Sequence, residues 1–198
     1  MNVDEIEATL APFGTVLRVG KSFGVLKLST GSAYQYDFAL PRKERKTAAG
    51  HCGFDVQCDP HLPPQIAASR RDFTINSILY DPIADQLLDY YGGIRDLEDR
   101  RLRHVSPAFV EDPLRVLRGM QFVSRFDLTP APETVDLCRK ICKTYHELAT
   151  ERIYGEWMKW ATLSKVPSRG ILFLEATRWW EHTPILSKLR KTPQDPIW

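Results

Sequence analysis

Residues 70–76 read Arg70-Arg71-Asp72-Phe73-Thr74-Ile75-Asn76, which places two arginines, a carboxylate and an amide around two apolar side chains. Arginine binds phosphate groups well, and an aspartate or asparagine can hold a ribose hydroxyl by hydrogen bonding. The segment therefore fits a nucleotide contact. It fits equally well the start of a helix that Asp72 caps, with the arginines in surface ion pairs.

A second polar segment reads Glu111-Asp112-Pro113-Leu114-Arg115-Val116-Leu117-Arg118. Asp112, Arg115 and Arg118 are spaced by three, so on a helix they lie along one side, one turn apart. A carboxylate accepts a hydrogen bond from the exocyclic amine of cytosine or adenine, and a guanidinium donates to the neighbouring ring acceptor, whereas uracil and guanine present the wrong pattern. The local alternative, which can coexist with base recognition, is that Asp112 caps a helix starting at Pro113 and that Arg115 is only paired at the surface.

The sequence before residue 107 has the pattern of a mixed α/β unit. The predicted elements are short: helices at 4–10 and 65–69, and strands at 15–19, 25–28, 34–40 and 86–90. In the third strand the aromatic residues alternate with Gln35, Asp37 and Ala39, so Asp37 is displayed on a sheet surface. Residues 41–64 are polar, basic and rich in Gly and Pro, which predicts a long mobile loop.

From Phe109 onward the apolar residues recur at helical spacing, as Ile153, Trp157 and Trp160 do. This spacing predicts an all-helical part, joined to the mixed α/β part near residue 107. No internal repeat or low-complexity tract interrupts this organisation.

The composition is that of a globular protein with no membrane role. Of the 198 residues, 43% are hydrophobic and 26% charged, and no apolar run approaches the roughly 20 residues needed to span a bilayer. The acidic N-terminus is not a secretory signal, so a cytoplasmic location is expected. The net charge of +2 does not by itself indicate nucleic acid, but the density of arginine between residues 70 and 125 suits a phosphate-containing partner.

The four cysteines raise the alternatives of disulfides, a zinc site or free buried thiols. Cys138 and Cys142 are four apart on a predicted helix and share a face, where buried and reduced cysteine is the expected state. A second group has the residue types of a zinc site without its usual spacing: His51, Cys52, Cys58 and His61. Zinc is therefore the lesser alternative for that group.

Taken in this order, the two arginine-containing segments resemble the family of class II tRNA nucleotidyltransferases (CCA-adding enzymes) and bacterial poly(A) polymerases. Further similar stretches extend the resemblance over nearly the whole chain: 20–24, 40–46 and 50–54 in the head's sheet and flexible loop, 88–97 and 102–109 in the head-to-neck connection, and Glu151-Arg152-Ile153 with Glu156 and Lys159 in the neck helix. The implied fold class is α+β. An incomplete polymerase-beta-like nucleotidyltransferase head, a small mixed sheet with helices, is expected at 1–106, followed by an all-helical, nucleotide-selecting neck at 107–198.

The resemblance implies nucleotide-binding roles by position. The matching residues are Arg71, Asp72, Asn76, Asp112, Arg115 and Arg118. Arg71 and Asp72 match residues that hold the sugar and phosphates of the incoming nucleotide. Asp112 and Arg115 match the amino-acid template that reads CTP or ATP, and Arg118 matches a further nucleotide contact. Gln121 stands where many members have another arginine.

Contacts with RNA and metal are implied at other positions. The expected RNA-binding residues are Arg42, Arg45, Lys46 and Arg152. Asp37 is similar in position to the family's third acidic residue, so it is the candidate catalytic residue and metal ligand. The family reaction uses two metal ions, usually Mg²⁺, which require clustered carboxylates. In the family these lie in an Asp-x-Asp strand preceded by a Gly-Gly-x-x-Arg-Asp loop, and neither pattern occurs at the matching place here.

The resemblance therefore implies a chain that is truncated at both ends. The first hypothesis is transfer of CMP or AMP from CTP or ATP to the 3′ end of tRNA or another RNA, with the missing head segment supplied by a homodimer partner or a complementing subunit. The alternative is a non-catalytic nucleotide- or RNA-binding remnant. Loss of strands from the head also predicts an open sheet edge and an exposed apolar face.

Overall fold

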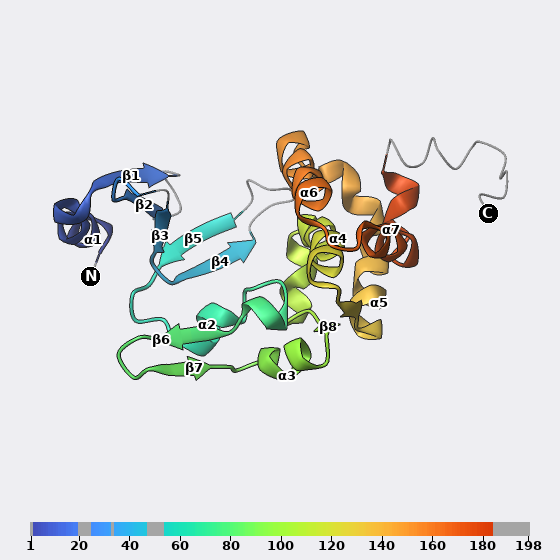
Figure 1. Cartoon of the computed structure of the whole chain (residues 1–198), viewed down its shortest axis with the longest axis horizontal. Coiled ribbons are helices and arrows are strands. Elements are labelled where there is room, and N and C mark those ends of the chain that lie inside the picture. The colour runs from blue at the N-terminus through green and yellow to red at the C-terminus, as the bar shows by residue number, and fades with distance from the viewer. Residues whose placement is uncertain (1, 20–24, 33, 47–53, 184–198) are drawn as a thin grey trace, which may run out of the picture. The chain divides into compact units, whose positions relative to one another are not determined.

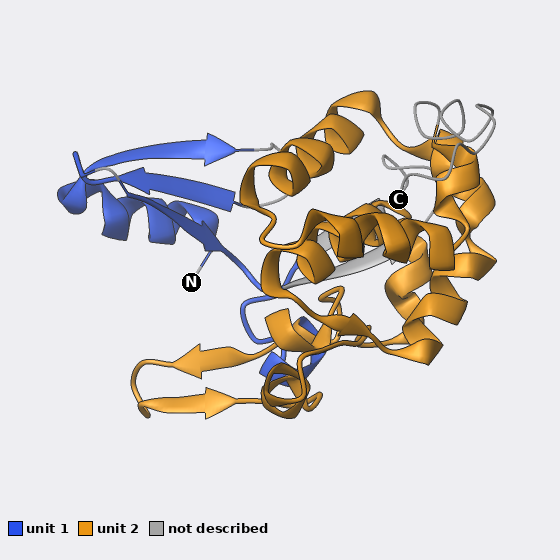
Figure 2. Cartoon of the chain, turned by 45° about the vertical axis from the view of Figure 1, so that its right-hand side comes forward, with its two compact units in different colours: residues 1–67 blue, residues 68–198 orange. Residues whose placement is uncertain are grey.

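The structure, a computed structural model, describes residues 2–19, 25–32, 34–46 and 54–183, with the backbone alone for residues 42–46 and 54–57. The chain divides into two compact units, Met1–Ala67 and Ala68–Trp198 (Figure 2). The predicted α+β class is confirmed, because small antiparallel sheets precede a largely helical part. The boundary expected near residue 107 is a different division from the one between these units and stays a prediction.

The described residues of the first unit form these elements before α2 (Figure 1): α1 (Val3–Leu10), a 3-10 turn (Ala11–Phe13), β1 (Thr15–Val19), β2 (Val25–Ser29), β3 (Gln35–Ala39), β4 (Arg42–Lys46) and β5 (Phe54–Cys58). Strands β1, β2 and β3 form one antiparallel sheet in that order. The helix and these three strands agree with the elements predicted from the sequence.

Helix α1 covers one face of the three-stranded sheet. It begins at Asn2, whose side chain accepts a hydrogen bond from the Glu5 N–H at 2.9 Å, while the Glu5 carboxylate accepts from the Asn2 N–H at 2.8 Å. Leu10 at the end of the helix packs with Leu26 and Leu28 of β2, and all three are buried. Alternation along β2 therefore decides which face of the sheet is covered.

The loop predicted for residues 41–64 is wrong for two stretches. Strands β4 and β5 pair as an antiparallel hairpin, with five register pairs running from Arg42↔Cys58 to Lys46↔Phe54. Pairing satisfies the backbone N–H and C=O groups whatever the side chains are, so a basic composition does not exclude a strand. Residues 47–53, which include His51 and Cys52 of the zinc alternative, lie outside the described residues.

The second unit is mainly helical, and α2 (Pro64–Ala68) leads into it. Its elements are a 3-10 turn (Thr74–Asn76), β6 (Leu79–Asp81), β7 (Gln86–Leu88), α3 (Gly93–Glu98), β8 (Arg101–Leu102), a 3-10 turn (Pro107–Glu111), α4 (Leu114–Phe126), β9 (Thr129–Pro130), α5 (Pro132–Lys140), a 3-10 turn (Cys142–Glu147), α6 (Thr150–Leu163), α7 (Pro167–Ala176) and a 3-10 turn (Trp179–His182). The helix predicted at 65–69 and the strand predicted at 86–90 are present with slightly different ends. No helix in the described ranges is long and apolar enough to cross a membrane.

The connection leading to α4 is tied to the helical part by backbone pairing. Strand β8 pairs in parallel with β9, and the Thr129 N–H donates to the Arg100 carbonyl at 2.7 Å. Before this connection, the Asp89 carboxylate accepts hydrogen bonds from the N–H groups of Gly93 at 2.8 Å and Ile94 at 2.9 Å at the start of α3. Burial alone would raise the pKa of Asp89, but these backbone donors lower it below its ordinary value. The carboxylate is thus held charged where it caps the helix.

The core of the second unit lies around α4, which packs against α6 and α7. Phe73, Val116, Leu174 and Trp179 are all fully buried there. Cys138 is also buried and free, as predicted, and burial raises the pKa of its thiol far above the ordinary value. Cys142 is half-buried and lies in the 3-10 turn after α5 rather than on the helix itself.

Helix α7 can approach α4 closely because position 170 is a glycine, and a larger residue there should lower the free energy of unfolding. A Cβ at Gly170 would lie 2.7 Å from Trp160 Nε1 and 2.9 Å from the Met120 carbonyl oxygen. Gly170→Ala should therefore lower the free energy of unfolding by about 1–3 kcal/mol through overpacking. Gly155→Ala on α6 is the matched control: a Cβ there meets no atom within 4 Å, so this change should stabilise by about 0.5–1 kcal/mol. Urea unfolding measures both, and equal effects would contradict the packing argument.

Candidate functional site

The segment at residues 70–76 is held by a buried carboxylate. Asp72, whose side chain is 6% exposed, pairs with the guanidinium Nε of Arg118 on α4 through its Oδ2. Its Oδ1 accepts from Asn76 Nδ2 at 2.7 Å and from the Phe73 N–H at 3.2 Å. Asp72 thus organises the local turn and orients Arg118, but it is not the expected helix cap, because Phe73 is the residue that precedes the 3-10 turn at Thr74–Asn76. A nucleotide contact at this segment stays a prediction.

Phe73 anchors this segment in the core. Its ring is fully buried and lies 5.6 Å from the Phe109 ring centroid and 5.5 Å from that of Phe122. Because Asp72 and Phe73 are adjacent in an extended stretch, one side chain enters the core while the other faces Arg118. The arginine at position 71 remains exposed.

Asp112 stands immediately before α4 and has two kinds of partner. Its Oδ1 accepts from the Leu114 N–H at 3.2 Å, which is the capping contact expected from the local sequence. Arg152 of α6 donates through Nη1 to Oδ1 at 3.3 Å and through Nη2 to Oδ2 at 2.8 Å. A two-pronged pair of this kind fixes the plane of the carboxylate.

Arg115 is not paired at the surface, so that part of the local alternative is wrong. Its Nη1 donates to the Ala108 carbonyl at 3.0 Å and its Nη2 donates to the Arg70 carbonyl at 3.0 Å. The guanidinium therefore joins the start of α4 to the 70–76 segment. Its aliphatic and cationic parts also lie near the Phe109 ring, with Cζ 6.0 Å from the centroid.

Arg118 lies in an acidic environment. Burial alone would lower the pKa of its guanidinium, but Asp72, and then Glu156 and Asp112, raise it above the ordinary value. Glu156 of α6 is buried and pairs with Lys159 at 2.8 Å, while its Oε2 has no hydrogen-bond partner among the described residues. The amide nitrogen of Gln121, one turn along α4 from Arg118, is likewise buried and unpartnered in the described part of the chain.

These contacts orient the side chains of Asp112 and Arg115 but leave part of their hydrogen-bonding capacity unused. A carboxylate offers about four acceptor positions, and the described contacts of Asp112 use three of them. A guanidinium has about five N–H donors, and the two described hydrogen bonds of Arg115 leave donors over. The site can therefore present a fixed acceptor and a fixed donor to a ligand.

The structure brings together most, but not all, of the predicted site residues. Asp72, Asn76, Asp112, Arg115 and Arg118 are connected within the second unit by the contacts above. Arg152, predicted to bind RNA, joins the same cluster through Asp112; its RNA role stays a prediction. No sequence pattern linked it to Asp112, 40 residues earlier, although its spacing of four from Glu156 on a helix indicated a shared face.

Arg71 lies exposed in the second unit, outside the contacts described above. The other predicted residues belong to the first unit. Asp37 lies on β3 with its side chain 63% exposed, and its Oδ1 is 3.8 Å from Lys27 Nζ. The side chains of Arg42, Arg45 and Lys46 are outside the described part, although the backbone of all three lies in β4. Their roles stay predictions.

Comparison with known proteins places this chain in a family. The family model described as the poly A polymerase head domain matches residues 4–103, about half of the chain. The multifunctional CCA protein of Stenotrophomonas maltophilia (strain R551-3) is 47% identical over 156 residues, which cover 76% of this chain and 37% of that protein. The multifunctional CCA protein of Xylella fastidiosa (strain 9a5c) is 46% identical over 144 residues, which cover 70% of this chain and 34% of that protein.

Solved structures show the same fold. The CCA-adding enzyme of Bacillus stearothermophilus in complex with CTP aligns with a TM-score of 0.75 at 24% identity, over 91% of this chain and 43% of that one. The Thermotoga maritima CCA-adding enzyme complexed with tRNA aligns with a TM-score of 0.71 at 24% identity, over 98% of this chain and 43% of that one. The chain belongs to the family of the poly(A) polymerase head domain, which is the tRNA nucleotidyltransferase family that the motifs resembled. It spans a little over a third of the length of the curated relatives it matches.

The two aspartates of the cluster should differ in their contribution to stability. Asp72→Ala should lower the free energy of unfolding by about 2–4 kcal/mol, because it leaves the partly buried Arg118 without its partner. Asp112 is more exposed, at 27% for its side chain, so Asp112→Ala should cost about 1 kcal/mol. Urea titration of both variants measures the difference. A larger loss for Asp112→Ala would show that the Asp72–Arg118 pair does not hold the segment.

Proposed function

We propose that this chain selects CTP and ATP for template-independent transfer of CMP or AMP to the 3′ end of tRNA. The observation that carries the proposal is the carboxylate of Asp112 and the guanidinium of Arg115, both fixed at the start of α4 and both with bonding capacity left. Family membership favours this function over a non-catalytic remnant. Because the chain spans 37% of the relative's length, the activity of the whole protein remains part of the proposal.

Base selection follows from the hydrogen-bonding patterns of the four bases. Cytosine and adenine each place an exocyclic amine beside a ring nitrogen that accepts a hydrogen bond. Asp112 accepts from the amine and Arg115 donates to the ring nitrogen. Uracil and guanine place a carbonyl beside a ring N–H, so an acceptor would face Asp112 and a donor would face Arg115.

The sugar and phosphates are assigned to the neighbouring residues. Arg71 is exposed, and no described side chain holds it. It supplies positive charge for the triphosphate, and Arg118 supplies a further nucleotide contact. Asp72 and Asn76 supply acceptor and donor groups for the ribose hydroxyls. The related enzyme of Bacillus stearothermophilus was solved with CTP, and a further CCA-adding enzyme was solved with ATP; both support nucleotide as the ligand.

RNA is the second proposed partner. The Thermotoga maritima relative was solved with tRNA, which supports a tRNA 3′ end as the acceptor. We assign phosphate contacts to Arg42, Arg45 and Lys46 of β4, and we retain Arg152 as an RNA contact that also positions Asp112. Such contacts should weaken with salt. We place the reaction in the cytoplasm.

Magnesium belongs to the family reaction, and we retain Asp37 as its proposed ligand and catalytic carboxylate. The described residues do not fit a two-metal site, because they contain no group of three metal-ligating side chains and Asp37 lies beside Lys27. No step is therefore derived through a metal. The proposal gives this chain the selection of the nucleotide.

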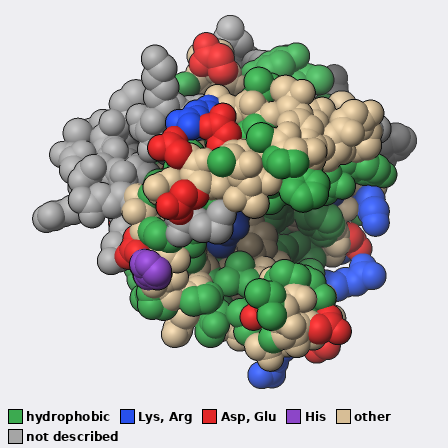
Figure 3. Space-filling model, turned by 90° about the vertical axis from the view of Figure 1, so that its left-hand side faces the viewer, with side chains coloured by type: hydrophobic (Ala, Val, Ile, Leu, Met, Phe, Trp, Pro, Cys, Tyr) green, Lys and Arg blue, Asp and Glu red, His purple; other side chains and the backbone are tan. Residues whose placement is uncertain are grey.

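A second polypeptide is proposed to cover the first unit, as a second copy of this chain or a chain that complements its head. The register of β1 with β2 places Leu17, Val19 and Val25 on the face opposite α1. Leu17 and Val19 are 55% and 42% exposed; apolar side chains also reach the surface on the face shown in Figure 3. A cluster of exposed apolar side chains on one sheet face suits an interface.

Nucleotide selection can be tested by calorimetry with CTP, ATP, UTP and GTP at one salt concentration. CTP and ATP should bind at least tenfold more tightly than UTP and GTP, because a good bidentate pair discriminates by about 1–3 kcal/mol. Asp112→Ala should abolish this preference. Asp136→Ala is the control, since Asp136 is an exposed acidic residue on α5. Binding without any preference in the unaltered chain would overturn the assignment, and transfer of labelled CMP or AMP to tRNA lacking its 3′ end tests the reaction itself.

The partner proposal can be tested by sedimentation equilibrium. The unaltered chain should associate with itself or with a complementing chain, and Leu17→Asp should abolish association because it places a charge in an apolar contact. Gln35→Asp is the control, because Gln35 lies on the same face of the sheet but contributes no apolar surface. A monomer that takes up no complementing chain, or equal association in both variants, would refute an interface at this face.

A further inference from the structure

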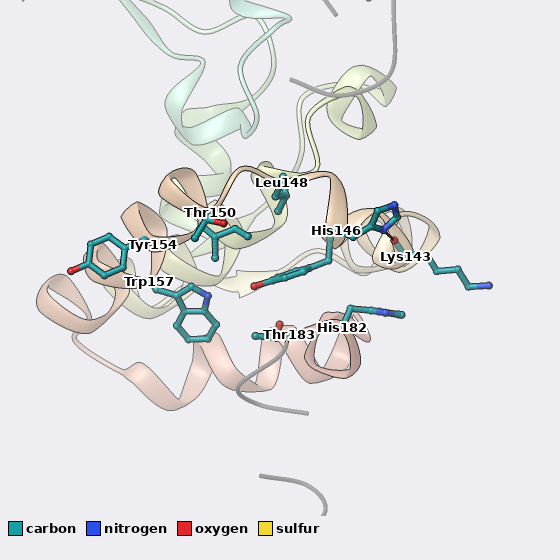
Figure 4. Close-up of a pocket in the computed structure, with 10 residues that line it drawn as sticks. Lys143, His146, Leu148, Thr150, Tyr154, Trp157, His182 and Thr183 are labelled. Atoms are coloured by element: carbon teal, nitrogen blue, oxygen red, sulfur yellow. Dashed lines mark hydrogen bonds between the residues drawn. The ribbon is translucent and has the colours of Figure 1, made fainter. Parts of the chain in front are cut away.

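A cavity of about 660 Å³ lies in the second unit (Figure 4), and none of the residues that line it belongs to the cluster around Asp72 and Asp112. Its walls come from the Cys142–Glu147 turn, the first turns of α6 and the Trp179–His182 turn. Cavities of roughly 300–1,000 Å³ are the usual size of small-ligand sites. No part of the proposed nucleotide selection uses it.

The walls are largely apolar and contain three aromatic side chains, Tyr145, Tyr154 and Trp157. Two of these rings lie against another aromatic side chain: the Tyr145 ring centroid is 5.8 Å from that of Trp179, and the Trp157 ring centroid is 5.3 Å from that of Trp160. Burial raises the pKa of Tyr145, although the nearby Trp157 partly offsets it, so the phenol is neutral. Rigid aromatic walls of this kind favour a flat ring as the occupant.

One end of the cavity is basic. Figure 4 shows Lys143, His146 and His182 on the side opposite Tyr154 and Trp157. None of the described residues that line the cavity is acidic. The acidic neighbour of His182 in the sequence, Glu181, is paired with Arg178 at 3.3 Å. An occupant with a negative group at this end is favoured by charge, whereas an apolar peptide would leave the basic groups without a partner.

We infer that this cavity is a second nucleotide-binding site, which takes a nucleobase against the ring of Trp157 and a phosphate at the Lys143 end. The same chemistry is offered by a free mononucleotide and by one nucleotide of an RNA chain. Helix α6 serves both sites with different side chains: Arg152 and Glu156 belong to the Asp112 cluster, while Ile153 and Trp157 line the cavity. The inference goes beyond the proposed function, because it requires no transfer reaction.

The experiment uses the full chain carrying Asp112→Ala, so that recognition at the first site is weakened. Calorimetry is performed with 5′-AMP, adenosine, inorganic phosphate and a short oligoadenylate. AMP should bind more tightly than adenosine or phosphate alone. Trp157→Ala should weaken AMP binding by about tenfold or more, as expected for loss of a base stack. Trp157→Phe, which keeps a ring, should retain most of the affinity.

A variant at the rim of the cavity and a local NMR signal test the inference independently of any effect of Trp157→Ala on folding. Lys143 is exposed, so Lys143→Glu should fold normally and weaken AMP binding while leaving adenosine unchanged. The imidazole proton signals of His146 and His182 in NMR spectra should shift with AMP. Tighter binding of oligoadenylate than of AMP identifies RNA as the source, and equal or weaker binding identifies the free nucleotide.

The inference is overturned if AMP shifts neither histidine signal, or if Lys143→Glu and Trp157→Ala bind AMP as the parent does. Loss of the nucleotide preference that depends on Asp112 does not affect this inference. Failure of the inference and failure of the proposed function are therefore separate results.

Discussion

The buried pair of Asp72 and Arg118 is the constraint on which the second unit depends. A carboxylate that is 6% exposed is costly to desolvate, and the cost is offset only because Arg118, Asn76 and the Phe73 N–H all donate to it. The pair joins positions 46 residues apart, so the turn at 70–76 and the first turns of α4 adopt their positions together. Phe73 can then enter the core beside Phe122, and the two polar segments of the sequence become one cluster.

Two arginines complete this arrangement. Arg115 spans the Ala108 and Arg70 carbonyls, and Arg152 holds the plane of the Asp112 carboxylate. Each arginine bonds to groups from another part of the chain, so neither side chain would have to be immobilised on binding of the proposed nucleotide. Preorganisation of this kind removes an entropic cost from binding and fixes the geometry needed for discrimination.

The sequence predicted what depends on local patterns. Alternation placed Asp37 on β3, helical spacing identified α6, and the interval of three placed Arg115 and Arg118 one turn apart on α4, whereas Asp112 lies in extended backbone before that helix. The β4–β5 hairpin was not predicted, because the basic composition of this segment is typical of a loop. Pairing of the two strands nevertheless satisfies their backbone N–H and C=O groups. The hydrogen bond of Arg115 to the Arg70 carbonyl and the pairing of Arg152 with Asp112 were not predicted, because they connect residues 45 and 40 positions apart. From the charges in the sequence alone, each of these arginines had several possible partners, so the actual partner could not be identified.

The same contacts bear on how a fixed acceptor and donor reject a wrong base. A pocket that only attracts the correct ligand discriminates weakly, whereas one that leaves buried polar groups unpaired with the wrong ligand discriminates strongly. Asp112 is about a quarter exposed before binding, so water can still compensate it. Stacking of the base over the cluster would remove that water, and only then would a carbonyl facing Asp112 carry its full cost. If the nucleotide binds as proposed, the partial exposure of Asp112 means that the nucleotide itself completes the closure on which its selection depends.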